Sequence, residues 1–93
     1  MSARANLLRN YRAAFLRYLS RHEEQSLTAG YHLGRSALAE GQSLLEVVHV
    51  HHDVLIEVLR DSPGEEVPTV ARSASEFLLE VLASYDMARR SPS

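Results

Sequence analysis

The chain has 93 residues, which is the length of one small domain and excludes a doubly wound sheet or a barrel enzyme. Its composition, 45% hydrophobic and 24% charged with 3 Pro and 4 Gly, excludes disordered and collagen-like chains. A net charge of −2 does not favour nucleic acid as a partner. The absence of cysteine excludes disulfides, thiolate zinc sites and cysteine nucleophiles.

The charge is unevenly distributed along the chain. Residues 1–22 carry five arginines and no acid, whereas residues 23–93 carry the other five arginines and all twelve acids. We interpret the basic start as a solvated helix face rather than a membrane contact or a transit peptide. No apolar run approaches the roughly 18 residues that a membrane span needs, so no membrane partner is expected.

Helical periodicity predicts two helices in the first part of the chain. The first has a buried stripe formed by Leu7, Leu8, Tyr11, Ala14, Phe15, Tyr18, Leu19 and His22. The second, over residues 23–39, has a stripe formed by Leu27, Gly30, Tyr31, Gly34 and Leu38. In one straight helix the two stripes would lie about 140° apart, so we predict a break near Ser20–Glu24. Ser20 and Glu23 fit a capping box there, and Gly30 with Gly34 predicts a closely packed neighbouring helix.

A third helix is predicted over residues 44–60. Gly41 suits the end of the preceding helix, and Ser43 with Glu46 predicts a capping box at the new start. The polar residues of this helix occupy a strip of only about 80°, so the wide apolar arc predicts burial on two sides. In so short a chain the second side is expected to face another subunit. We therefore predict a homodimer interface at Val47, Val50, Val54 and Ile56.

A fourth helix is predicted after the turn at residues 61–64. Pro68 suits its start, and its core stripe comprises Val70, Ala74, Phe77, Leu78, Val81, Leu82 and Tyr85. Leu79, Ala83 and Met87 form a second apolar line on the opposite side, which predicts a contact surface for a partner or a second copy. We assign residues 1–90 to one helical domain and interpret residues 91–93 as the start of a linker or a tail.

The histidines do not predict a metal site. Only His49 and His52 have suitable helical spacing, and no third ligand is evident. His51 lies in the middle of the apolar arc, so we predict a core histidine whose ring bonds to a neighbour. No paired carboxylates or nucleophile elbow are present, so we expect neither catalytic residues nor a cofactor.

Two alternatives remain open for the function. Phosphorelay proteins place an exposed histidine on a helix of a four-helix bundle, so a histidine phosphotransfer or dimerisation domain of a two-component system is possible. His49 or His52 would then accept the phosphoryl group. The other alternative is a purely structural dimerisation module without a further partner.

Several groups of residues resemble the N-terminal domain of the RsbU family of regulatory serine phosphatases. The weaker groups are Tyr11, Tyr18-Leu19, 24–27, Ala37-Leu38, Val50-His51 and Val54-Leu55, and the most specific block runs from Phe77 to Ala88. The resemblance covers Tyr11 to Ala88 with almost no gaps. It implies an all-α, four-helix domain that is also similar to the C-terminal domain of the clock protein KaiA and forms a dimeric helical bundle.

The resemblance also implies a role in bacterial stress signalling. In the family this cytoplasmic, non-catalytic domain binds a switch-type serine kinase, RsbT, which turns on a phosphatase domain later in the chain. That phosphatase acts on an anti-anti-sigma factor and so frees a sigma factor. The partner surface implied for this chain comprises Glu24, Thr28, Leu79 and Ala83. Relatives carry a larger aromatic at Thr28 and often a larger aliphatic at Ala83, which predicts weaker binding or a different partner.

Overall fold

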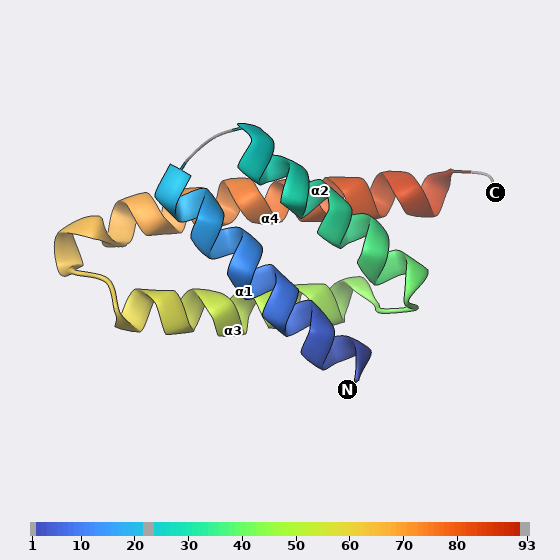
Figure 1. Cartoon of the computed structure of the whole chain (residues 1–93), viewed down its shortest axis with the longest axis horizontal. Helices are drawn as coiled ribbons and strands as arrows, with labels where there is room; N and C mark the ends of the chain where they lie inside the picture. The colour runs from blue at the N-terminus through green and yellow to red at the C-terminus, as the bar shows by residue number, and fades with distance from the viewer. Residues whose placement is uncertain (1, 22–23, 92–93) are drawn as a thin grey trace.

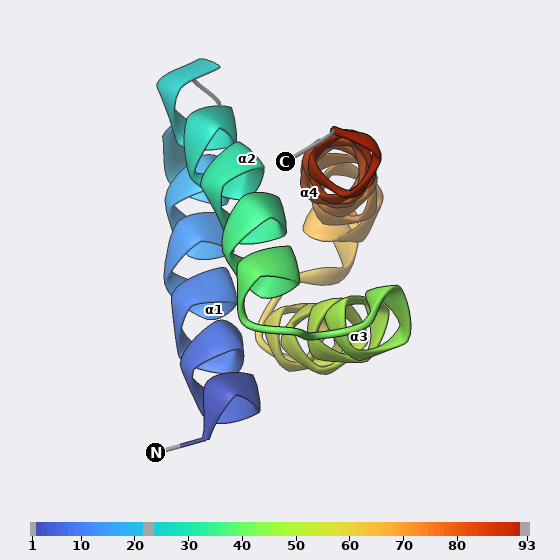
Figure 2. The same cartoon turned by 90° about the vertical axis from the view of Figure 1, so that its right-hand side faces the viewer.

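The computed structural model describes residues 2–21 and 24–91, with Glu24 described by its backbone only. Its helices are α1 (Ala3–Arg21), α2 (Glu24–Ala39), α3 (Leu44–Arg60) and α4 (Val67–Arg90), with a short 3-10 turn, η1 (Gly64–Glu66), before α4. Figures 1 and 2 show α1 and α2 side by side in one layer, which lies obliquely across a second layer of α3 and α4. The described residues form no strand, which confirms the all-α prediction.

The predicted break between the first two helices is confirmed. α1 ends at Arg21 and α2 begins at Glu24, and the two run side by side in opposite directions (Figure 2). The predicted capping partner Glu23 and the predicted stripe residue His22 lie outside the described residues. The prediction that Ser20 caps the second helix is wrong: Ser20 lies inside α1, and its hydroxyl donates to the Leu16 carbonyl at 3.0 Å.

Phe77 of α4 is the centre of the core. Its ring lies 5.2 Å from that of Tyr11, 5.6 Å from that of Phe15 and 5.9 Å from that of Tyr18, centroid to centroid. The three partners are spaced along one face of α1, and all four rings are buried. Aromatic pairs of this kind contribute about 0.5–1.5 kcal/mol each beyond their buried area, so this cluster holds α1 onto α4.

α2 and α4 approach each other most closely at Gly34. A side-chain carbon at this position would lie 2.9 Å from the backbone nitrogen of Tyr85 and closer still to the Val81 carbonyl. At Gly30 an added carbon would lie 3.3 Å from the Phe77 ring, which is tight but involves a side chain. The close helix packing predicted from the two glycines is therefore confirmed, and Gly34 is the position that requires it.

The connections around α3 follow the predicted signals. Gly41 has a φ of 77°, and the Gln42 amide donates to the Ala37 carbonyl at 2.9 Å, as in a helix end of the Schellman type. The Ser43 hydroxyl accepts from the Glu46 amide at 3.1 Å, and the reciprocal bond completes the capping box. The Tyr85 hydroxyl donates to the Gln42 carbonyl at 2.6 Å, so this connection is held against α4.

α4 begins and ends as the sequence predicts. Pro68 lies in its first turn, where a missing amide hydrogen has no cost. The last turn carries Arg89 and Arg90, which pair with Asp86 at 2.7 and 3.1 Å. These cations also interact favourably with the negative end of the helix dipole, so both the ion pairs and the dipole stabilise the last turn.

Candidate docking and dimerisation surfaces

The outward apolar line of α4 borders a groove. Leu79 is 67% exposed, and Ala83 and Met87 are also exposed. The groove lies between α3 and α4, measures about 390 Å³ and is lined by Leu44, Val48, Leu79, Leu82, Ala83 and Asp86. We call it the docking groove. Its walls are mainly apolar, with the arginine-paired carboxylate of Asp86 as the acidic group, so it suits an apolar side chain or helix face.

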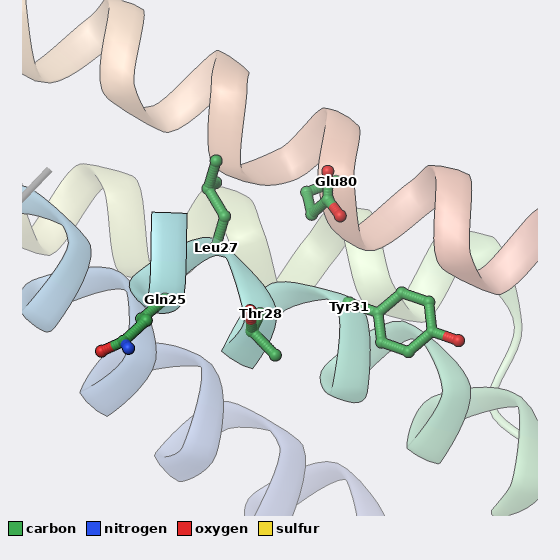
Figure 3. Close-up of a pocket in the computed structure, with 5 residues that line it drawn as sticks. All are labelled: Gln25, Leu27, Thr28, Tyr31 and Glu80. Carbon is green, nitrogen blue, oxygen red and sulfur yellow. The ribbon is translucent and has the colours of Figure 1, made fainter. Parts of the chain in front are cut away.

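Thr28 lies in a different groove, between α2 and α4. This α2–α4 groove measures about 520 Å³ and is lined by Gln25, Leu27, Thr28, Tyr31 and Glu80. Figure 3 shows Glu80 of α4 across from Thr28 and Tyr31 of α2. Both walls carry polar groups, a carboxylate on α4 and a hydroxyl, a phenol and an amide on α2, beside the apolar side chain of Leu27.

The four residues of the predicted partner surface are therefore only partly brought together. Leu79 and Ala83 share the docking groove, whereas Thr28 lies in the α2–α4 groove. α4 separates the two grooves and supplies consecutive residues, Leu79 and Glu80, to one and the other. The side chain of Glu24 lies outside the described residues, and its backbone starts α2 one turn before Thr28. A single partner contacts both grooves only if it also covers the surface of α4 between them, at Leu79 and Glu80.

α3 has two apolar sides, as predicted, but three of the predicted interface residues lie on the inner one. Val47, Val50 and Val54 are buried in the core of their own chain. Ile56, in contrast, is 37% exposed, and so is the outer side of the helix at Leu45 (68%) and Val48 (38%). In the described fold, the α3 surface that a second chain can reach is this outer side.

The predicted hydrogen bond of His51 is confirmed. The Tyr11 hydroxyl lies 2.8 Å from Nδ1 of His51, and the imidazole is half-buried between α1 and α3. Burial lowers the pKa of His51, and the neighbouring His52 lowers it further, while burial raises the pKa of Tyr11. These shifts favour the neutral forms of both groups, and the imidazole tautomer sets which of the two donates the hydrogen bond.

The remaining histidines of α3 are solvent-accessible. His49 and His52 are both exposed, so neither is a core residue. Among residues 2–21 and 24–91, no three His, Asp or Glu side chains are grouped so that they could hold a metal ion. Within the same residues, no helix combines the length and the apolar character that crossing a membrane requires.

Comparison with known proteins shows a match to one protein family. Residues 9–88 match the family model described as "Phosphoserine phosphatase RsbU, N-terminal domain". The matched region includes α2, α3 and the residues of both grooves. The model corresponds to the regulatory N-terminal part of the phosphatase and not to its catalytic domain. No curated protein and no solved structure matched the chain.

Proposed function

Because the chain belongs to the family of RsbU N-terminal domains, we propose that it is a non-catalytic docking domain for a switch-type serine kinase of the RsbT kind. Kinase binding would activate a serine phosphatase or another effector in bacterial partner switching. The observation that carries the proposal is the exposed apolar docking groove on α4, in a chain whose family is regulatory. A domain whose role is to be bound needs such a surface, because buried apolar anchors supply most of the binding free energy.

Leu79 is the proposed anchor of the interface. Its exposed side chain loses contact with water when a partner covers it, and Ala83 one turn later leaves room for a helix to approach. Thr28 and Glu80, in the α2–α4 groove, would form the polar rim of this interface. Glu24, at the start of α2, would extend that rim by one turn.

The proposed mechanism is non-covalent. Leu79 and Ala83 lie on the same continuous helix as Met87 and Arg90, so a partner that contacts them also touches the helix leading to residue 91. The hydrogen bond from Tyr85 to the Gln42 carbonyl lies between these positions and couples α4 to the start of α3. Docking would thus reorient the segment after Ala88 and regulate an effector without any chemical step.

We also propose that the chain forms a homodimer. The support is the outer side of α3, where Leu45, Val48 and Ile56 remain exposed although the same helix contributes three valines to the core. An apolar side of this extent on a small helical domain is typical of a protein contact. Leu79 lies on the other wall of the docking groove from Val48, so dimer and kinase contacts are adjacent but use different anchors.

Titration calorimetry against switch-type kinases tests the docking proposal. Leu79→Asp should weaken kinase binding at least about tenfold, because it places a charge at a desolvated anchor. Leu16→Asp is the matched control, since Leu16 is a 45% exposed leucine on α1, away from both grooves, and it should bind like the unmodified chain. Equal binding by both variants would exclude the docking groove. Circular dichroism verifies that both variants are folded.

A further inference from the structure

The outer side of α3 has a symmetric sequence spacing. Leu45 and Val48 lie seven and four residues before His52, and Ile56 and Leu59 lie four and seven residues after it. At 3.6 residues per turn, these offsets place all four side chains within about 40° of His52 on the helix surface. We call these five residues the outer stripe. Leu45, Val48, His52 and Ile56 are exposed, and Leu59 is partly exposed.

We propose that the outer stripes of two copies pack against each other with their helices antiparallel and His52 facing His52 of the second copy. This inference rests on the homodimer proposed above and specifies its geometry. A two-fold interface is self-complementary: if residue i contacts residue j, then j contacts i. Antiparallel pairing about His52 meets this condition, because it opposes Leu45 with Leu59 and Val48 with Ile56.

The charges beside the outer stripe favour the same orientation. Glu46 lies near the start of α3 and Arg60 at its end, on the same edge of the stripe. A two-fold axis across the helix pair keeps this edge on the same side in both copies. Antiparallel pairing therefore brings Glu46 of one copy beside Arg60 of the other. Parallel pairing would instead place this edge on opposite sides of the helix pair in the two copies, so Glu46 would not meet Arg60, and it would also align the two helix dipoles.

His52 has a clear role in such a pair. A single polar residue among apolar contacts lowers the stability of a helix pair but selects one register, because any shift would place the polar group against an apolar side chain. With His52 on the axis, only the symmetric register pairs imidazole with imidazole. A shift of one turn would bury the imidazole against Val48 or Ile56 of the second copy.

The cysteine-free chain allows a direct cross-linking test. In the antiparallel register only a residue on the two-fold axis meets its own counterpart, so His52→Cys should oxidise to a covalent dimer. Ile56→Cys alone should cross-link slowly, because its partner position is Val48. An equimolar mixture of Val48→Cys and Ile56→Cys should again form dimers. We expect His52→Cys to react at least about tenfold faster than Ile56→Cys, since disulfides need Cα atoms within about 7 Å.

Two controls make each outcome decisive. Leu16→Cys on α1 gives the rate of random collisions, and circular dichroism verifies that each variant is folded. Self-cross-linking of Ile56→Cys as fast as that of His52→Cys would overturn the antiparallel register. If light scattering shows a dimer of the unmodified chain while His52→Cys reacts no faster than Leu16→Cys, the α3 geometry is wrong and the dimer stands. A monomeric unmodified chain would overturn both the antiparallel α3 geometry and the homodimer. Kinase titration does not enter this experiment, so the docking proposal is judged separately.

Discussion

The hydroxyl of Tyr11 in α1 and Nδ1 of His51 in α3 share a hydrogen bond of 2.8 Å between residues 40 positions apart. Six residues further along α3, Glu57 pairs with Arg12 of α1 at 3.0 Å. The ion pair is exposed and contributes little to stability. The Tyr11–His51 bond is partly shielded from water and is therefore the more stabilising of these two polar contacts between α1 and α3.

Acid should weaken the fold through His51. Burial and the neighbouring His52 lower the pKa of His51 below its usual 6.5, so the unfolded chain binds a proton at a higher pH than the folded chain does. The stabilising effect of the neutral imidazole is complete above pH 6.5 and is lost as the pH falls through the folded-state pKa. Urea unfolding at several pH values from 7.5 to 5 should show this decline. His51→Gln should reduce the decline, and an identical pH dependence would contradict the assignment.

Tyr11→Phe should lower the free energy of unfolding by about 1 kcal/mol. The ring and its packing against Phe77 are retained, so the loss reports the hydroxyl and its bond to His51. Tyr31→Phe is the matched control, because the Tyr31 hydroxyl meets only an exposed Arg35 guanidinium at 3.4 Å. Urea unfolding of the two variants should separate them. Equal losses in the free energy of unfolding would mean that the Tyr11–His51 hydrogen bond stabilises the fold no more than the exposed Tyr31 contact does.

Gly34→Ala should destabilise the protein although alanine is the better helix former. Alanine gains about 1 kcal/mol of helix propensity, but its methyl group would meet the backbone of α4 at Val81 and Tyr85. Forcing the helices apart typically costs about 1–3 kcal/mol, so the net change should be a lower melting temperature. Gly64→Ala is the control, since nothing lies within 4 Å of the added carbon. A Gly34→Ala variant as stable as this control would show that α2 and α4 can separate freely.

Tyr85→Phe should destabilise the connection between α2 and α3. It removes the donor to the buried Gln42 carbonyl, and an unsatisfied buried carbonyl costs about 1–3 kcal/mol. Hydrogen exchange should show faster opening of the amides in the first turn of α3, where Ser43 and Glu46 form the capping box. Exchange in the middle of α1 should change less. Uniform acceleration throughout the chain would instead indicate a global loss of stability.

The helices and their ends could be predicted from sequence because the signals are local. Gly41, the Ser43–Glu46 pair and Pro68 each act within one turn of the boundary they mark. The inner face of α4 was also predictable, since one of its sides is clearly more polar. These features depend on chemistry that is readable within a few residues.

The surfaces were harder because they depend on which side of a helix its own chain covers. α3 is apolar on both sides, so its pattern does not distinguish Val50, which faces the core, from Val48, which faces outward. The separation of Thr28 from Leu79 into two grooves follows from how the two helix layers cross, which no local pattern encodes. The hydrogen-bond partner of His51 could not be predicted either, because Tyr11 is distant from it in the sequence.

Because α4 is long, a small tilt of this helix would produce a larger displacement at its C-terminal end. Its 24 residues extend about 36 Å, nearly the whole length of the molecule in Figure 1, and the ion pairs of Asp86 stiffen its last turn. Arg90 lies eleven residues, or roughly 16 Å, beyond Leu79. A tilt of about 5° at Leu79 would therefore swing the far end by about 1.4 Å.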